Sequence, residues 1–249
     1  MTTAIAISHV SKYFGRTGGG TLALDDVSLN VREGELLCIL GRSGCGKSTL
    51  LNLVAGLESS SRGSIDTGGR PVGMMFQDAN LYPWLTVSGN IELALRLSGV
   101  PRSDRAARID ELLEVVRLSG AHKKRPHELS GGMRQRVALA RALAQDCRIL
   151  LMDEPFGALD AITRDAMHDQ TERISAERGL TIMFVTHNVR EAARLGDRVI
   201  VMAPGPGRIA SELDVDLPRP RRMDDAAVAL AAAELHDLLE RHELELHRG

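Results

Sequence analysis

Five short, mostly apolar runs along the chain are bounded by polar or glycine-containing segments, and each run predicts a β-strand. These runs are Leu36–Leu40, Val72–Phe76, Ile149–Met152, Leu180–Val185 and Arg198–Met202. Near-continuous apolarity, as in Ile149–Met152, is typical of a central parallel strand that is covered on both faces. Helical patterns separate most of the runs, so the sequence predicts an α/β fold.

Outside these runs, the pattern predicts a strand pair near the start of the chain and a block of helices in the middle. Ala4–Ile7 and Leu22–Val31 are predicted strands around a loop that contains Gly18–Gly20, in a hairpin region. From about Thr86 to Gly120 the apolar spacing becomes helical. Positions i, i+3, i+4 and i+7 there form one apolar face, at Ile109, Leu112, Leu113 and Val116. No catalytic residue type is concentrated in this block, which indicates a helical insertion.

A phosphate-binding pattern follows the apolar run Leu36–Leu40. Residues Gly41–Thr49 fit the spacing G-x-x-x-x-G-K-[ST] in the order strand, glycine loop, helix. The glycines let the backbone wrap closely around an anion, and the helix that begins near Lys47 directs its positive dipole end at the same point. Lys47 can reach the β- and γ-phosphates, and the Ser48 hydroxyl can coordinate Mg²⁺. The loop therefore predicts a nucleoside triphosphate with magnesium, but alone it does not distinguish a transporter motor from a kinase, GTPase or helicase.

Polar side chains stand at the ends of predicted strands, where ligands bind in open α/β sheets. Gln77 follows Val72–Phe76 and could contact the metal or the attacking water, the alternative being a solvated loop residue. Asp153 would hold Mg²⁺ through its water shell, and Glu154 could polarise the water that attacks the γ-phosphate. His187 could hydrogen-bond the γ-phosphate or that water, although a lone histidine is more often structural.

A second anion-binding device opens the predicted helix Arg134–Ala144. Leu129–Met133 places Ser130, Gly131 and Gly132 at the helix start, with free N–H groups and a helix dipole but no lysine. A chain rarely needs two phosphate sites for one phosphate, so we expect this one to close over a nucleotide held by another copy. Taken alone, a capped helix with a glycine turn is the simpler interpretation.

Cys45 lies inside the phosphate loop, beside Lys47 and a helix N-terminus. Both features favour the thiolate, so we expect oxidation or alkylation of this thiol to block nucleotide binding. Bound Mg-ATP should then protect Cys45 from a thiol reagent.

Composition bears on the partners and on the cellular compartment of the protein. The 249 residues carry 31 Lys and Arg against 33 Asp and Glu, so no overall attraction to nucleic acid is expected. The three cysteines have neither disulfide nor zinc spacing, which suits a reducing cytoplasm. Met1–Val10 lacks a signal-peptide pattern, and no run approaches ~18 apolar residues. We therefore expect any work at a membrane to go through partners.

Taken together, the motifs resemble those of the ATP-binding cassette (ABC) ATPases over about residues 4 to 210. In chain order they are similar to Walker A at Gly41–Thr49, the Q-loop at Gln77, the signature motif at Leu129–Met133, Walker B with its catalytic glutamate at Ile149–Glu154, the D-loop at Ala158–Asp160 and the switch histidine at His187. Any one motif could mislead, but the whole set in this order is very specific. Met133 departs from the pattern, since many members carry glutamine there. Backbone groups do most of the expected phosphate binding, so activity is still expected.

The resemblance implies a P-loop NTPase (RecA-like) core with an N-terminal antiparallel β subdomain and an inserted α-helical subdomain. Residues 1–249 would form a single ABC ATPase domain. Within it, 1–85 and 146–221 would form the nucleotide-binding core with the β subdomain, 86–145 the helical signature subdomain and 222–249 a C-terminal helix, which we expect to pack against its own chain. The apolar residues of that helix lie on roughly one face, at Val228, Leu235, Leu238, Leu239, His242 and Leu246.

The resemblance also implies the cofactors ATP and Mg²⁺ and a head-to-tail dimer with two ATP molecules at its interface. Glu154, His187 and Gln77 would be catalytic. The metal would be held by Ser48, Gln77 and Asp153. ATP would be bound by Phe14, Gly41, Ser43, Gly44, Cys45, Gly46, Lys47, Ser48, Thr49, Ser130, Gly131, Gly132 and Asp160. Phe14 is the expected adenine-stacking residue, with Tyr13 as the second choice.

Other segments are similar to bacterial importers of nitrate, aliphatic sulfonates and taurine: Phe76–Asp78, Leu81–Val87, Phe156–Asp160 and Val201–Ile209. This likeness implies a motor subunit for uptake of a small anionic solute. Its partners would be two integral membrane permease subunits, contacted through Gln77–Val87, and indirectly an extracytoplasmic solute-binding protein, with no nucleic acid. The chain would lie peripherally on the cytoplasmic face of the cell inner membrane. Trp84 would be an anchor at that contact or a buried packing residue.

The alternative is a soluble ABC ATPase that acts on a macromolecular complex rather than on a transporter. Members that act on ribosomes usually carry two cassettes in one chain, and DNA-repair members insert long coiled coils or zinc sites. This sequence has one cassette and neither insertion, which favours the importer.

Overall fold

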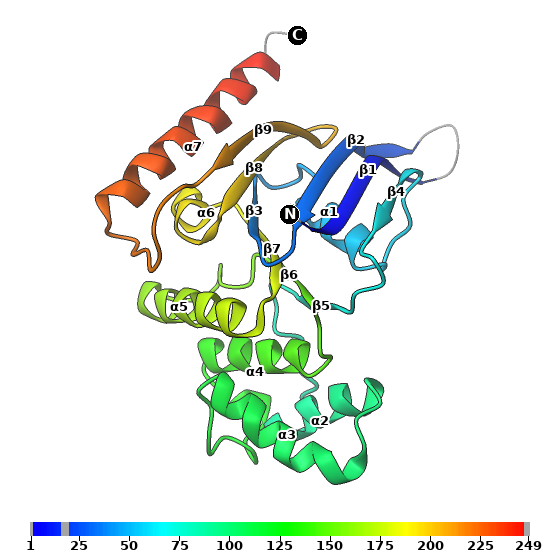
Figure 1. Cartoon of the computed structure of the whole chain (residues 1–249), viewed down its shortest axis with the longest axis vertical. Helices are drawn as coiled ribbons and strands as arrows, with labels where there is room; N and C mark the ends of the chain where they lie inside the picture. The colour runs from blue at the N-terminus through cyan, green and yellow to red at the C-terminus, as the bar shows by residue number, and fades with distance from the viewer. Residues whose placement is uncertain (1, 16–19, 247–249) are drawn as a thin grey trace. The chain divides into compact units, whose positions relative to one another are not determined.

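A computed structural model describes residues 2–15 and 20–246, with side chains up to residue 241. The chain divides into two compact units (Figure 1). Unit 1 comprises Met1–Gly69 and Thr181–Gly249, and unit 2 comprises Arg70–Leu180. Gly18 and Gly19 of the predicted hairpin loop lie outside the described residues.

Three antiparallel strands form one sheet of unit 1. Strands β1 (Thr3–Phe14), β2 (Thr21–Arg32) and β4 (Arg62–Asp66) lie in the order β2-β1-β4. In the centre of this sheet Ile7 stands opposite Leu29 on one side and Ile65 on the other. The predicted N-terminal antiparallel β subdomain is therefore confirmed.

The second sheet region of unit 1 contains β3 (Leu36–Leu40), β7 (Thr181–Thr186), β8 (Arg198–Ala203) and β9 (Arg208–Asp214), in the order β7-β3-β8-β9. β3 runs parallel to both neighbours, and β9 runs antiparallel to β8. All residues of β3 and β7 are buried, as their continuous apolar runs predict for strands covered on both faces.

Three helices complete unit 1: α1 (Lys47–Val54), α6 (Val189–Leu195) and α7 (Ala226–Leu246). Val228 and Leu235 of α7 are buried, and the helix contacts α6 and β8. The C-terminal helix thus packs against its own chain, as expected. The side chains of His242 and Leu246 lie outside the described residues.

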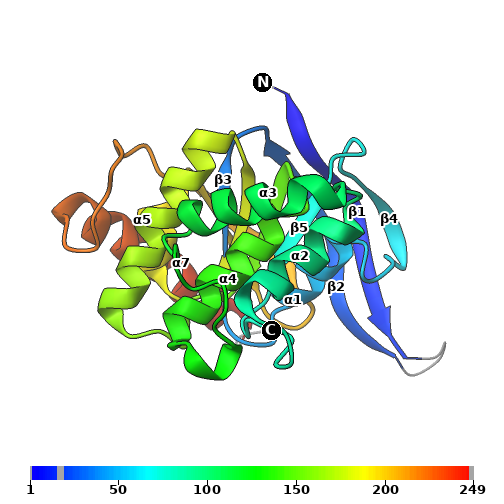
Figure 2. The same cartoon turned by 90° about the horizontal axis from the view of Figure 1, so that it is seen from below.

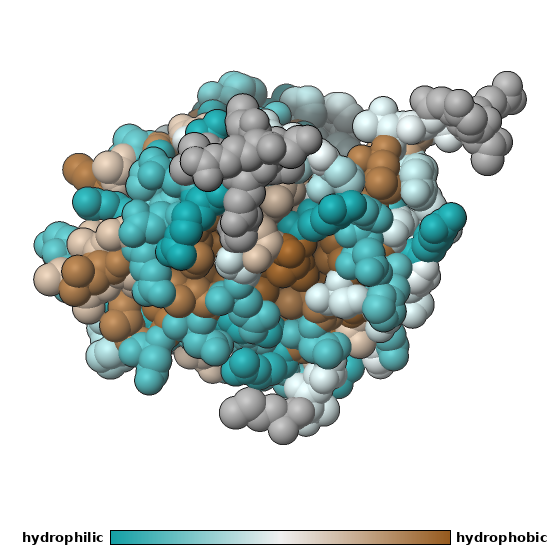
Figure 3. Space-filling view, turned by 90° about the horizontal axis from the view of Figure 1, so that it is seen from above, coloured by the Kyte–Doolittle hydropathy of each residue, from teal (hydrophilic) through white to brown (hydrophobic). Residues whose placement is uncertain are grey.

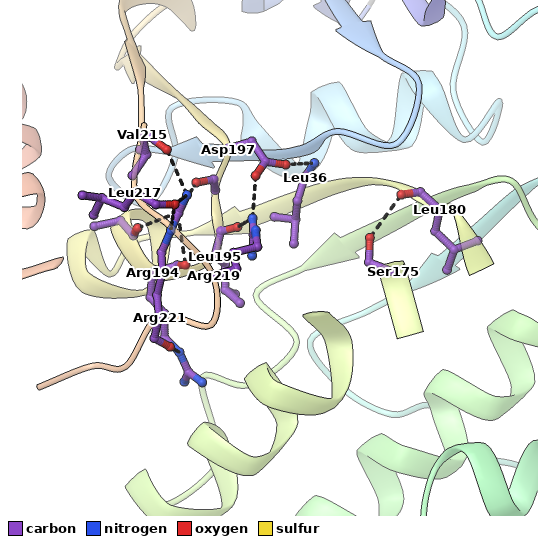
Figure 4. A network of polar contacts seen from close by, with 12 residues as sticks. Leu36, Ser175, Leu180, Arg194, Leu195, Asp197, Val215, Leu217, Arg219 and Arg221 are labelled. Atoms are coloured by element: carbon purple, nitrogen blue, oxygen red, sulfur yellow. Dashed lines mark hydrogen bonds and ion pairs between the residues drawn. The ribbon is translucent and has the colours of Figure 1, made fainter. Parts of the chain in front are cut away.

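Two arginines of the segment before α7 satisfy the carbonyl groups at the end of α6 (Figure 4). The Arg221 guanidinium donates hydrogen bonds to the carbonyls of Ala193 (3.1 Å) and Gly196 (2.6 Å), and also to those of Arg194, Val215 and Leu217. Arg219 donates to the Leu195 carbonyl at 2.5 Å. Since the last carbonyls of a helix have no partner within it, these side chains replace a C-terminal cap.

Unit 2 combines a pair of parallel strands with a helical block. β5 (Val72–Met75) pairs with β6 (Ile149–Asp153). The helices are α2 (Val87–Leu97), α3 (Arg102–Val115), the 3₁₀ turn η1 (Pro126–Glu128), α4 (Gly131–Leu143) and α5 (Ala161–Arg178). Helices α2, α3 and α4 contact one another (Figure 2). The predicted apolar face of α3 is buried, which confirms the helical block, whereas its boundaries at 86 and 145 stay predictions.

The face drawn in Figure 3 shows hydrophobic areas among hydrophilic residues. Over residues 2–15 and 20–246, no helix combines the length and the apolar character needed to span a membrane.

Candidate functional site

The phosphate loop of unit 1 has a backbone that only glycine allows at several positions. Gly44 and Gly46 have φ of +83° and +94°. A Cβ on Gly41 would lie 2.6 Å from the Cys45 Sγ atom, and one on Gly46 would lie 2.6 Å from Leu24 Cδ2. Gly46 precedes α1 and supplies no side-chain cap to the start of this helix. This loop fits a phosphate group closely approached by backbone N–H groups.

The Lys47 side chain lies within this loop. Its Nζ atom donates to the carbonyls of Gly41 at 2.7 Å and Arg42 at 2.9 Å, and the residue is buried. Ser43 and Ser48 are exposed, and Thr49 is half-buried. The ammonium group therefore lies inside the predicted loop, bonded to two of its carbonyls, and phosphate binding by Lys47 and metal binding by Ser48 stay predictions.

The expectation of a reactive Cys45 thiolate is wrong. Cys45 is fully buried, and this burial raises the pKa of its thiol. Lys47 lowers the pKa, as expected, but by less than burial raises it. Desolvation disfavours the charged thiolate, and this effect outweighs the attraction of Lys47.

The sheet of unit 1 places His187 beside the phosphate loop. Thr186, the last residue of β7, pairs with Leu40, the last residue of β3, so His187 and Gly41 follow neighbouring strands at the same edge. The Thr186 hydroxyl donates to Glu191 (2.5 Å) and accepts from the Asn188 N–H (3.0 Å), which fixes the turn around His187. His187 itself is exposed.

Phe14 stands at the end of β1 with 41% of its surface exposed, while Tyr13 is 42% exposed. The Lys12 Nζ atom lies 4.8 Å from the centroid of the Phe14 ring. The same ammonium group donates to Glu58 (2.8 Å) and to the Ser59 carbonyl (2.9 Å), so it is held in place over the ring. Phe14 thus has an oriented, exposed ring, and adenine stacking by Phe14 stays a prediction.

Unit 2 brings Gln77 and the two adjacent carboxylates to one edge. Met75 of β5 pairs with Met152 of β6, so Gln77, Asp153 and Glu154 all follow the carboxyl ends of neighbouring parallel strands. Glu154 has φ of +43°, which is uncommon for residues other than glycine. At this φ the chain leaves the extended conformation of β6, so the alternating side-chain pattern of the strand ends here. This edge concentrates oxygen ligands suited to Mg²⁺.

The signature segment and Asp160 also lie together in unit 2, at the first turns of α4 and α5. Ser130 caps α4 through a hydrogen bond from the Met133 N–H at 3.3 Å. A Cβ on Gly132 would lie 2.3 Å from Thr163 Cγ2, so any larger residue here would force Thr163 or a helix start to move. Asp160 caps α5, and the hydrogen bond from the backbone N–H of Thr163 lowers the pKa of its carboxyl. Two helix N-termini therefore adjoin here, each with a polar capping side chain.

Several supporting residues had no signal in the sequence pattern. The Gln135 side chain of α4 donates to the Gln77 carbonyl at 2.7 Å. Arg141, on the same helix, donates to the carbonyls of Asn80 (2.6 Å) and Ala79 (2.9 Å). Helix α4 therefore carries the signature segment at its start and holds the segment after Gln77 along its length.

The segment Leu81–Val87 carries two neighbouring aromatic residues, and a buried side chain fixes its backbone. Trp84 is 67% exposed, and its ring centroid lies 5.4 Å from that of Tyr82. The buried Asn90 side chain accepts from the Tyr82 N–H (2.8 Å) and donates to the Thr86 carbonyl (2.9 Å). Of the two roles considered for Trp84, the exposed position excludes buried packing.

Comparison with known proteins agrees with these features. A family model described as ABC transporter matches residues 24–157. The chain is 48% identical over 218 residues to the taurine import ATP-binding protein TauB of Jannaschia sp. (strain CCS1), covering 84% of this chain and 81% of that protein.

It is also 48% identical over 233 residues to the nitrate import ATP-binding protein NrtC of Synechococcus elongatus, covering 89% of this chain. The matched region spans only 35% of NrtC. Among solved structures, the dimeric post-hydrolysis state of the ATP-binding cassette MJ0796 bound to ADP and Pi has a TM-score of 0.75 and 32% identity, over 86% of this chain and 100% of that chain.

Proposed function

This chain belongs to the ABC transporter family, and from that premise we propose that it hydrolyses ATP as the motor subunit of a bacterial importer for a small anionic solute. Relatives similar over most of this chain are import ATP-binding proteins for nitrate, taurine and aliphatic sulfonates. The observation that carries the proposal is that one chain holds a phosphate loop, a carboxylate pair at a strand end and a second anion-binding helix start.

Different residues would bind the phosphates, the adenine and the magnesium ion of Mg-ATP. The loop Gly41–Thr49 would bind the phosphates, and Phe14 would stack on adenine. Ser48, Gln77 and Asp153 would hold Mg²⁺, which neutralises charge on the phosphate oxygens when bound. Carboxylate, amide and hydroxyl oxygens are the ligands that this ion prefers, so the residue set fits it.

Hydrolysis needs a base and a group that stabilises the developing charge. The Glu154 carboxylate would accept a hydrogen bond from the attacking water and orient it toward the γ-phosphate. His187, which follows β7 in unit 1, would hydrogen-bond the γ-phosphate or the same water. Gln77 would orient the water together with its metal contact.

A second copy of the chain completes each site in this proposal. The helix start at Ser130–Gly132 supplies N–H groups and a positive dipole end but no lysine, so it suits a phosphate already held by a phosphate loop. A head-to-tail pair would place the signature segment of each copy on the ATP of the other. Closing and opening of that dimer would drive the transport step.

Membrane subunits would dock on Gln77–Val87. The exposed Trp84–Tyr82 pair offers a large amphipathic surface on a segment that Asn90 holds rigid, which suits the centre of an interface. The chain would then lie peripherally at the cytoplasmic face of the inner membrane, and a solute-binding protein would act with it only indirectly.

ATP turnover by the purified chain and its Glu154→Gln variant tests the proposal. We expect Glu154→Gln to retain ATP binding, lose nearly all turnover and accumulate as an ATP-bound dimer in size-exclusion chromatography. Undiminished turnover by Glu154→Gln would remove this carboxylate from the mechanism.

Purification of the tagged chain from detergent-solubilised membranes of its host tests the importer. Recovery of multi-span membrane proteins supports it. Recovery only with a ribosome or an assembly scaffold would keep the ATPase and overturn the importer.

A further inference from the structure

A pocket of about 410 Å³ lies in unit 2 between the loop after α3 and the first turns of α4. It is lined by Arg117, Leu118, Ser119, Gly120, Ala121, Lys124, Met133 and Arg136. All of these residues belong to Arg70–Leu180, so unit 2 forms the pocket alone. Three of the lining side chains are cationic and none is acidic.

None of the three cations is held in an ion pair within the described residues. Within the part of the chain that the structure describes, no carboxylate forms an ion pair with Arg117, Lys124 or Arg136, although other arginines of unit 2 pair with Glu111 and Glu177. Burial, together with the adjacent charge of Arg117, lowers the pKa of Arg136. Arg117 and Arg136 therefore repel each other in the empty pocket, and a bound anion would relieve this repulsion.

The backbone of this loop also leaves N–H groups without a protein acceptor. Arg117 and Gly120 have φ of +56° and +86° and bound the turn that contains them. Among the described residues, none accepts a hydrogen bond from the exposed N–H group of Ser119 or of Gly120.

The loop is also fixed at its base. The Val115 carbonyl, at the end of α3, accepts hydrogen bonds from Gln170 at 3.0 Å and Arg173 at 2.7 Å, both on α5. Ala121 N–H donates to the Leu118 carbonyl at 3.0 Å. A preformed loop loses little conformational entropy when it binds a ligand, which favours affinity.

We propose that this pocket is a further anion site, besides the phosphate loop and the helix start at Ser130–Gly132, that binds a small dianionic oxyanion group between Arg117, Lys124 and Arg136. The charge balance favours a dianion, because three cations line the pocket without an acidic residue. The dianion is a free phosphate or sulfate ion, or the phosphate of a small phosphate ester, since the pocket is larger than the ion itself. This inference does not rest on the proposed function.

Isothermal titration of the full chain carrying Lys47→Ala, which disables the phosphate loop, tests the pocket. The probes are sodium sulfate, sodium phosphate and glycerol 3-phosphate, each at an ionic strength matched with sodium chloride. We expect one binding site per chain. Added Arg117→Gln or Arg136→Gln should each weaken binding about tenfold, the lower end for a charge-assisted hydrogen bond.

Lys123→Gln is the matched control, because it removes the same charge from the adjacent, exposed residue that does not line the pocket. It should leave the affinity within about twofold. Tighter binding of glycerol 3-phosphate assigns the site to phosphate esters, and tighter binding of the inorganic ions assigns it to free oxyanions.

Equal affinity in the Arg136→Gln and Lys123→Gln proteins would overturn the proposal, as would absence of binding by a Lys47→Ala protein with the circular dichroism spectrum of the wild type. Lys124→Gln, at an exposed position, replaces any pocket variant that fails to fold. Loss of ATP turnover would overturn the proposed function and leave these titrations unaffected.

Discussion

Replacing Gly132 by alanine tests the contact between the first turns of α4 and α5. The new Cβ would lie 2.3 Å from Thr163 Cγ2, whereas carbon atoms in contact stand about 3.5–4.0 Å apart. Either a helix start must shift by roughly 1 Å or Thr163 must leave its rotamer, and over-packing of this kind costs about 1–3 kcal/mol. We therefore expect Gly132→Ala to lower the free energy of unfolding by about 2 kcal/mol.

Thr163→Ser provides the matched rescue. It removes the Cγ2 methyl group, and the remaining Thr163 Cβ atom lies at an ordinary 3.7 Å from the new Cβ. The double variant should therefore be more stable than the sum of the two single changes predicts, with a coupling of about 1–2 kcal/mol. Urea unfolding followed by far-ultraviolet circular dichroism measures all four proteins.

Wild-type stability of Gly132→Ala, or a double variant with no coupling, would refute this steric reasoning. ATP turnover of the same four proteins then separates packing from phosphate binding. If Gly132 is required only for packing, turnover returns with stability in the double variant. If the backbone at Gly132 must approach a phosphate, stability returns and turnover does not.

Three further predictions concern other parts of the molecule. Arg221→Ala should lower the free energy of unfolding, measured with urea, by about 3 kcal/mol, because buried carbonyls at the end of α6 lose their donor. The control Arg222→Ala, at the exposed neighbouring position, should change this free energy by less than about 0.5 kcal/mol. Equal effects of the two variants would contradict the capping role of Arg221. Because burial raises the pKa of Cys45, iodoacetamide should alkylate this thiol roughly tenfold more slowly than it alkylates a small thiol at pH 8. Peptide mass spectrometry measures this rate, which should rise at higher pH. A rate equal to that of the small thiol would show a reactive thiolate. Trp84→Ala should leave unfolding within about 0.5 kcal/mol but weaken recovery of membrane proteins with the tagged chain, and unchanged recovery would remove Trp84 from the docking surface.

The sequence by itself determined those features whose signal is local. Continuous apolar runs predicted the buried strands β3 and β7, and the i, i+3, i+4, i+7 spacing predicted the buried face of α3. The spacing of Gly41–Thr49 predicted the strand, loop and helix that the structure contains. Motif order along the chain was enough to indicate the family, because each motif is short and contiguous.

Tertiary structure alone decided the features that depend on residues far apart in sequence. The pKa of the Cys45 thiol is the clearest case: a lysine two residues away lowers it, but the burial of the thiol raises it by more, and this burial is not visible in the sequence pattern. The need for glycine at position 132 arises from Thr163 on another helix, and the support of Gln77 comes from Gln135. Spacing patterns carry no record of such contacts, because desolvation and steric fit depend on which distant side chains share the same volume.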